Sequence, residues 1–386
     1  MKPFEFFKEN NKVIANPNKI KLEIPHDWKI VKLGEVAKVG SGRKPPIQDR
    51  GDIPVYGKSV LGFTTKPMIK SGKVLIMSNF PRPFSPQVVE APVWVTPGFL
   101  YIVPKGNAVV AEYLKLFLEF LGPDIILPSG SGVPRISARR LASLDIVLPP
   151  LEEQKAIVKI FQLFDEALET GEKTVDLINK LKKATIDTIF VNFLERYPRV
   201  KVGDVATLVK RSPSTSGAAS FPVITAARVP SGTLYLRAED VIGSDKTPKP
   251  RTLFKPGEIL YVKQNPKLDR VVVSKFEGLA TADIFVISVD RTKVLPEYLA
   301  LILHSSEFLD YAERLSSGSV LPRISWGDLS NFQFPLPPLD IQKNVVSNIV
   351  KLDELERLKL TKFSLLQDLR SYLLHTLLTG KVRAHI

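Results

Sequence analysis

Apolar residues along the chain follow two spacings, and these spacings predict where strands and helices lie. Short apolar runs bounded by glycine and proline, typical of strands, occur at 74–77, 100–103 and 284–289. Apolar residues at helical spacing predict two helices of ordinary length, over 111–121 and 296–309. The order of these segments predicts a mixed α/β (α+β) chain.

Two longer stretches carry apolar residues at heptad spacing. The first, 151–195, contains no proline and would reach roughly 65 Å as one helix. The second covers 339–378. Because neither helix can bury its own apolar stripe, we expect the two to pack on each other as an antiparallel coiled coil. Gly171 falls in the first stripe, where it indicates a close approach or a local kink.

The chain contains an internal duplication. Leu-Pro-Pro-Leu-Glu-Glu-Gln-Lys at 148–155 recurs as Leu-Pro-Pro-Leu-Asp-Ile-Gln-Lys at 336–343. Pro-Arg-Ile-Ser precedes each copy, at 134–137 and 322–325. In both copies, two prolines end an extended segment and acidic residues in the next turn favour the start of a helix. A duplication of this kind predicts two similar domains, each followed by a long helix.

The duplication also includes the domains themselves. A strand followed by one helical turn is predicted at 31–37 and again at 200–206. Further along, 72–119 aligns without gaps with 257–304. The chain between these two aligned segments is longer in the second half, so the second domain contains an insertion before Gly257. Such insertions usually lie in surface loops.

These patterns predict an α/β (α+β) architecture in which two similar globular domains are separated by two long helices. We expect, in order, a polar tail over 1–23, a first domain over 24–148, a central helix over 149–196, a second domain over 197–335 and a C-terminal helix over 336–386. In the antiparallel arrangement the two domains would lie at opposite ends of the helix pair.

Composition adds a partner class. The chain has 54 Lys and Arg against 40 Asp and Glu, a net charge of +14, which favours a polyanion such as nucleic acid. A generally basic surface without such a partner is the alternative. The absence of cysteine excludes disulfides and thiolate metal sites. With no apolar run of membrane-spanning length and no signal-peptide core, we expect a cytoplasmic protein without a membrane partner.

No motif for catalysis or metal binding is evident. Gly51–Ser59 resembles a phosphate loop but has five residues between its glycines instead of four. Asp124, Glu153 and Lys155 formally match a metal-dependent nuclease, although the second copy replaces the glutamate with Ile341. A nuclease built on these three residues and a coiled-coil scaffold with incidental charge remain the alternatives to DNA recognition. We expect no catalytic site and no metal site.

The duplicated segments, taken with both flanks, resemble the specificity (S) subunits of type I restriction–modification systems over residues 24–386. The resemblance implies a non-catalytic, DNA-binding subunit whose two target-recognition domains each read one half of a bipartite, asymmetric sequence in double-stranded DNA. It implies that the helices set the gap and dock two modification subunits, which methylate adenine using S-adenosylmethionine. Restriction subunits that use ATP and magnesium are implied as further partners, and no cofactor is implied for this chain.

Candidate DNA contacts are the basic residues of the two domains, which suit phosphates and guanine edges. In the first domain they are Arg43, Lys44, Arg50, Lys58, Lys66, Arg82 and Arg135. In the second they are Lys210, Arg211, Arg228, Arg237, Lys246, Lys249, Arg251, Lys263, Lys267, Arg270 and Arg323. For each one, ordinary solvated surface charge is the alternative. Because Arg135 and Arg323 occupy equivalent positions, we expect them to hold a loop or contact phosphate and not to select bases.

Overall fold

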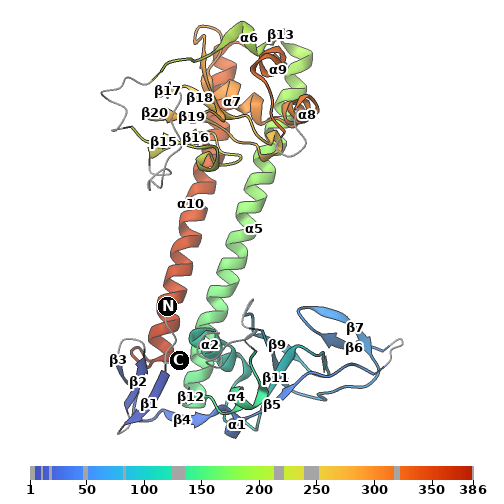
Figure 1. Cartoon of the computed structure of the whole chain (residues 1–386), viewed down its shortest axis with the longest axis vertical. Coiled ribbons are helices and arrows are strands. Elements are labelled where there is room, and N and C mark those ends of the chain that lie inside the picture. The colour runs from blue at the N-terminus through green and yellow to red at the C-terminus, as the bar shows by residue number, and fades with distance from the viewer. Residues whose placement is uncertain are drawn as a thin grey trace. The chain divides into compact units, whose positions relative to one another are not determined.

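The computed structural model describes residues 5–9, 12–16, 20–46, 51–80, 84–122, 135–212, 221–238, 252–316 and 322–384, and only the backbone of those before Ile24. These residues divide into two compact units. Unit 1 comprises residues 1–169 and 364–386, and unit 2 comprises residues 170–363. Each unit contains a mixed α/β part and a portion of both long helices (Figure 1).

An antiparallel sheet of four strands organises unit 1. Its order is β5, β11, β8 and β9, with bounds Ala37–Ser41, Phe99–Pro104, Lys73–Ser78 and Gln87–Glu90. Both faces of β8 are covered, because Leu75 and Met77 join the core that contains helix α2 (Ala111–Leu121), while Val74 and Ile76 pack with Val93 and Val95. The strands predicted at 74–77 and 100–103 and the helix predicted at 111–121 are confirmed.

Smaller elements complete unit 1. A second sheet has the order β10, β6 and β7, with bounds Trp94–Val95, Ile53–Tyr56 and Val60–Thr64. The predicted strand and helical turn are β4 (Lys29–Lys32) and α1 (Leu33–Val36). Strand β4 pairs with β12 (Asp145–Leu148), and α4 (Ala138–Ala142) packs beside α1. This packing places the end of the domain next to its beginning.

The first residues of the chain differ from the expected tail. Their backbone forms three antiparallel strands, β1 (Glu5–Glu9), β2 (Lys12–Asn16) and β3 (Ile20–Glu23). Phenylalanine, valine and isoleucine in these strands favour extended structure, and the asparagines and proline between them favour turns. The expectation of a tail gave too much weight to the lysines and asparagines.

Unit 2 repeats the sheet of unit 1 and extends it by one strand. Its order is β14, β21, β18, β19 and β16, with bounds Ala206–Leu208, Ile284–Val289, Ile259–Val262, Val271–Ser274 and Tyr235–Leu236. The remaining strands are β15 (Val223–Ile224), β20 (Gly278–Ala280), β17 (Thr252–Phe254), β13 (Arg199–Lys201) and β22 (Gln333–Pro335). Short helical segments are α6 (Val202–Val205), η2 (Ala226–Arg228), η4 (Pro266–Leu268) and α9 (Trp326–Asn331). The strand predicted at 284–289 is confirmed as β21.

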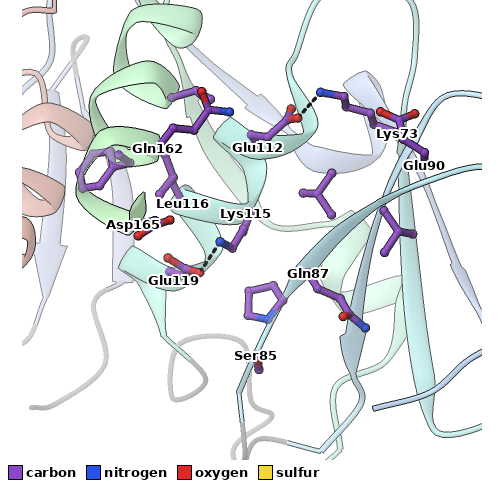
Figure 2. Close-up of a pocket in the computed structure, with 15 residues that line it drawn as sticks. Lys73, Ser85, Gln87, Glu90, Glu112, Lys115, Leu116, Glu119, Gln162 and Asp165 are labelled. Atoms are coloured by element: carbon purple, nitrogen blue, oxygen red, sulfur yellow. Dashed lines mark hydrogen bonds and ion pairs between the residues drawn. The ribbon is translucent and has the colours of Figure 1, made fainter. Parts of the chain in front are cut away.

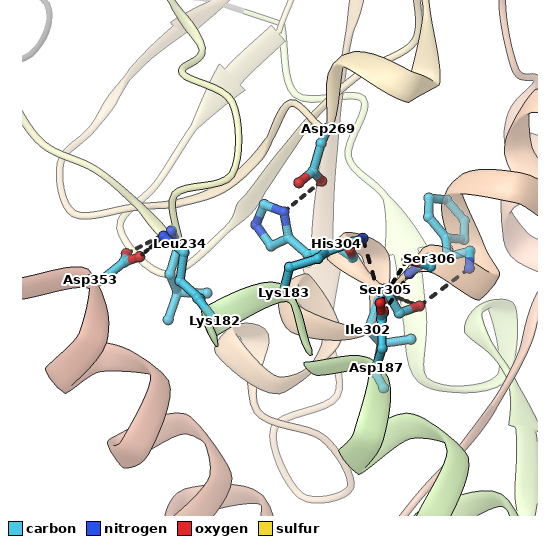
Figure 3. A network of polar contacts seen from close by, with 11 residues as sticks. Lys182, Lys183, Asp187, Leu234, Asp269, Ile302, His304, Ser305, Ser306 and Asp353 are labelled. Atoms are coloured by element: carbon cyan, nitrogen blue, oxygen red, sulfur yellow. Dashed lines mark hydrogen bonds and ion pairs between the residues drawn. The ribbon is translucent and has the colours of Figure 1, made fainter. Parts of the chain in front are cut away.

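The single helix predicted over 296–309 is wrong. The chain forms two helices instead, α7 (Pro296–His304) and α8 (Ser306–Leu315). Ser305 between them is extended, and its hydroxyl accepts a hydrogen bond from the Phe308 amide. Asp187 accepts hydrogen bonds of 2.7 Å from both the amide and the hydroxyl of Ser306 (Figure 3). The break is stabilised by a residue far away in sequence, so apolar spacing alone does not reveal it.

The two long helices are α5 (Leu151–Arg196) and α10 (Leu339–Leu378), as predicted. In unit 2, Lys182 of α5 donates 2.7 Å hydrogen bonds to Asp353 and Glu356 of α10. A Cβ atom at Gly171 would lie 3.4 Å from the Phe363 ring. Residues further along α5 therefore contact residues nearer the start of α10, so the two helices pack antiparallel there. Gly171 marks a close approach between them.

The glutamine of each duplicated motif clamps the start of a long helix to a domain. The Gln154 carbonyl accepts from the Val110 amide at 3.0 Å, and its amide group donates to the carbonyls of Ala108 and Pro149. Gln342 repeats this pattern with the Leu295 amide at 2.8 Å and the carbonyls of Lys293 and Pro337. The equivalent glutamines thus fix the first turn of α5 to the start of α2 and that of α10 to the start of α7.

The end of the chain is held within unit 1. Arg383 donates 2.7 Å hydrogen bonds to both carboxylate oxygens of Glu153 and also pairs with Asp27. The Trp28 indole donates to Glu153 at 2.9 Å. Burial alone would raise the pKa of Glu153, but the hydrogen bonds from Arg383 and Trp28 hold it below its usual value. Glu153 therefore anchors the end of the chain, a role that Ile341 at the equivalent position could not perform.

Candidate nucleic-acid interface

Four candidate cations of unit 1 lie around its smaller sheet. Arg43 and Lys44 follow β5, Lys58 lies in the turn between β6 and β7, and Lys66 follows β7. All four side chains are exposed. The backbone of the Arg43 loop is fixed, since the Trp94 indole donates to the Arg43 carbonyl and the Arg43 amide donates to the Val95 carbonyl, each at 2.8 Å. A fixed backbone with an exposed guanidinium suits contact with a phosphate or a base edge.

The same hairpin exposes apolar side chains that the sequence analysis missed. Leu61 is 64% exposed and Phe63 is 52% exposed, both on β7. Exposed apolar residues among cations are able to contact thymine methyl groups or insert between bases. The signal in the sequence was an apolar strand flanked by Lys58 and Lys66, which the search for basic residues alone passed over.

Arg135 is exposed and stacks on an aromatic ring. Its guanidinium carbon lies 5.0 Å from the centre of the Phe80 ring. The next residue, Ile136, donates its amide to the Asn79 carbonyl at 2.7 Å. The contacts join the Pro-Arg-Ile-Ser segment to the end of β8, in keeping with a loop-holding role. Arg50 and Arg82 lie outside the described residues.

In unit 2, several candidate cations are occupied within the domain. Arg211 forms a two-pronged pair with Glu258 at 3.0 and 3.2 Å and donates to the Leu253 carbonyl. Glu258 holds the pKa of Arg211 above its usual value. Lys267 pairs with Glu313 at 2.7 Å, and Arg270 donates to the Ala226 carbonyl at 3.1 Å. These three side chains support loops in the observed conformation.

Other candidates meet at one hollow in unit 2. Lys210 and Lys263 both line a depression of about 340 Å³ next to Phe285. Lys263 donates to the Ala282 carbonyl and lies 4.5 Å from the centre of the Phe285 ring. Its pKa is lowered by burial and by Arg323, which itself pairs with Asp283 at 3.4 Å. This hollow brings together Lys210 and Lys263, two predicted residues that are far apart in sequence.

The remaining candidate cations of unit 2 are either half-buried or outside the described residues. Arg228 and Arg237 are half-buried and engaged in contacts within the chain. Lys246, Lys249 and Arg251 lie outside the described residues.

The residues of the alternative nuclease do not form a common site in the described part of the chain. Glu153 is occupied by Arg383 and Trp28, whereas Lys155 pairs with Glu152 at 2.7 Å on the exposed side of α5. Asp124 lies outside the described residues. Within the described part of the chain, no cluster of His, Asp or Glu is arranged to hold a metal ion. No helix there is long and apolar enough to cross a membrane.

Comparison with known proteins identifies the two units. The type I restriction modification DNA specificity domain matches the chain twice, over residues 25–178 and 196–367. The type I restriction enzyme MjaVIII specificity subunit of Methanocaldococcus jannaschii is 22% identical, covering 98% of this chain and 97% of that protein. The EcoDI specificity subunit of Escherichia coli is 23% identical, covering 86% of this chain and 82% of that protein.

Solved structures share the fold. The crystal structure of the type I restriction–modification S subunit from M. genitalium has a TM-score of 0.58 at 15% identity, with both chains fully covered. A structure described for complex assembly and conformational transition of the type I system has a TM-score of 0.54 at 19% identity, covering 93% of this chain and 99% of that one. The chain thus belongs to the family of type I restriction–modification DNA specificity subunits, which recognise DNA and are not themselves catalytic.

Proposed function

We propose that each unit reads one half of a bipartite, asymmetric DNA target. The observation that carries this proposal is the duplicated domain architecture, whose two copies carry different side chains on their surfaces. In unit 1 the exposed set is Arg43, Lys44 and Lys58 with Leu61 and Phe63. In unit 2 the set is the exposed Lys210 with the half-buried Lys263. Two similar readers with different side chains should select two different half-sites.

The long helices supply a spacer between the two readers in this proposal. Gln154 and Gln342 fix a domain to the start of each helix, which supports a constant gap between half-sites. We assign the recognition domains to residues 24–148 and 197–335 and the spacer helices to 149–196 and 336–386. Two modification subunits, and restriction subunits beyond them, are the protein partners that this role requires. The site of action would be the cytoplasm, where the cell keeps its DNA.

Selection from a randomised duplex library tests the proposal. The chain, assembled with its modification subunit, should enrich duplexes with two specified blocks separated by a gap of constant length. Replacement of both Arg43 and Lys44 by alanine should weaken selection in one block and leave the other intact. Loss of selection in both blocks to the same degree would show that these residues supply only general phosphate attraction.

A further inference from the structure

The two units differ at the open edge of their main sheets. In unit 1 the described sheet ends at β9, whereas in unit 2 the equivalent strand β19 is followed by β16. The chain between β15 and β18, which contains β16, is longer than the chain between β6 and β8. The additional strand β16 thus lies in the insertion that makes the second domain longer than the first.

In unit 2, β16 is held by contacts to three elements. It runs parallel to β19, and the amides of Val273 and Lys275 donate to the carbonyls of Leu234 and Leu236 at 2.8 and 3.1 Å. The Leu234 amide donates to Asp353 of α10 at 2.9 Å (Figure 3). The Tyr235 hydroxyl donates to Glu297 of α7 at 3.4 Å. An extended segment with one tyrosine therefore fills the space between sheet and helices.

Unit 1 has a groove of about 590 Å³ at the equivalent place, between β9, α2 and α5 (Figure 2). Glu112 and Asp165, which line the groove, stand at the positions that align with Glu297 and Asp353 in the duplication. Arg370 pairs with Asp165 at 2.9 Å, as Lys182 pairs with Asp353 in unit 2. The walls of the space are thus repeated in unit 1 without the strand.

The groove of unit 1 contains polar groups that have no partner among the described residues. The Ala91 amide donates to the Gly72 carbonyl, so the amides of Val88 and Glu90, which alternate with it along β9, point away from β8. They match Val273 and Lys275, whose amides bind the β16 segment. One carboxylate oxygen of Glu112 is buried without a hydrogen-bond partner among the described residues. An open strand edge of this kind is a template for pairing with another chain.

We propose that this groove binds an extended segment of the modification subunit, which adds as a strand parallel to β9. The proposal rests on the proposed function, which supplies this partner. An aromatic hydroxyl in the segment would reach Glu112, as Tyr235 reaches Glu297. Unit 2 places Lys275 3.6 Å from the Tyr235 ring centre, whereas unit 1 has the acidic Glu90 at that position. A lysine or arginine in the segment would therefore complement Glu90. Strand addition combines backbone hydrogen bonds for affinity with pockets for alternate side chains.

Residue-resolved hydrogen–deuterium exchange on the full chain tests the proposal directly. In the chain alone, the amides of Val88 and Glu90 should exchange rapidly, whereas the Val89 amide, which faces β8, should be protected. Addition of the modification subunit should slow exchange at Val88 and Glu90 by about tenfold or more. If both amides are already protected in the chain alone, a segment of this chain fills the groove and the proposal is overturned.

Two pairs of variants measure the contribution of the groove to assembly. Val88→Pro removes the outward amide and Val88→Ala retains it, so affinity for the modification subunit should be about tenfold weaker for the proline variant. Glu112→Gln should weaken binding of the modification subunit. Glu297→Gln should not, because β16 already fills the space beside Glu297 in unit 2. Equal affinities within both pairs would overturn this inference alone. Failure of the unaltered chain to form the complex would overturn the proposed function as well.

Discussion

At the scale of single residues, the glutamine explains the structural role of the duplicated motif. Gln154 and Gln342 have no exposed surface, and each satisfies one backbone amide and two backbone carbonyls. An amide side chain is suited to this task because it carries both an acceptor and two donors. The prolines before it end a strand, and the glutamine fixes how the helix leaves the domain.

Replacement of Gln342 by alanine should lower the free energy of unfolding by about 3 kcal/mol, because buried backbone groups would lose their partners. Denaturant unfolding followed by circular dichroism measures this change. Gln367→Ala, in an exposed position of the same helix, is the matched control and should cost less than about 0.5 kcal/mol. Similar values for both variants would show that the clamp contributes nothing beyond an ordinary surface contact.

The sequence shows which residues are basic, but not which of them form ion pairs within the folded domain. Arg211 and Lys267 were as plausible as Lys210 until the structure paired them with Glu258 and Glu313. Both partners are distant in the chain, so their pairing depends on how strands and loops meet. Leu61 and Phe63 were missed because charge was the only criterion for a contact with DNA.

At the scale of elements, the helix pair contains a repeated ion pair. Lys182 with Asp353 in unit 2 and Arg370 with Asp165 in unit 1 stand at positions that the duplication aligns, with the cation and the carboxylate exchanged between the helices. Burial alone would lower the pKa of Lys182, but Asp353 and Glu356 hold it above its usual value. Lys182 therefore remains charged, and its pairing favours one register of the helices.

Replacement of Lys182 by methionine should lower the free energy of unfolding by about 3–5 kcal/mol, because two carboxylates would remain in a largely buried site without a cation. Thermal and denaturant unfolding measure the loss. Lys180→Met provides the control, since Lys180 forms an exposed pair with Asp176 and should contribute less than about 1 kcal/mol. A small effect at Lys182 would mean that water or another cation replaces it.

Element prediction succeeded where a pattern is local and failed where distant residues decide. Heptad spacing and the lack of proline predicted α5 and α10, and glycine-bounded apolar runs predicted β8, β11 and β21. The break at Ser305 depends on Asp187, and β16 depends on Asp353 and Glu297. The spacing of apolar residues within either segment does not reveal those distant partners.

At the scale of the whole molecule, the internal duplication is the feature that links sequence to function. One sheet architecture is built twice, and each copy carries its own insertions and its own set of surface cations. Two non-identical readers joined by helices of fixed length should recognise two different blocks with unread base pairs between them. The central claim is therefore that the target is split and asymmetric.

Genome-wide mapping of methylated adenines would show whether the target is split and asymmetric. The chain and its modification subunit would be expressed together in a host that lacks other adenine methylation. Two different readers on one spacer should produce one asymmetric motif with two specified blocks and a gap of constant length. A contiguous or palindromic motif, obtained with the complex shown to be assembled, would contradict the assignment of one half-site to each unit.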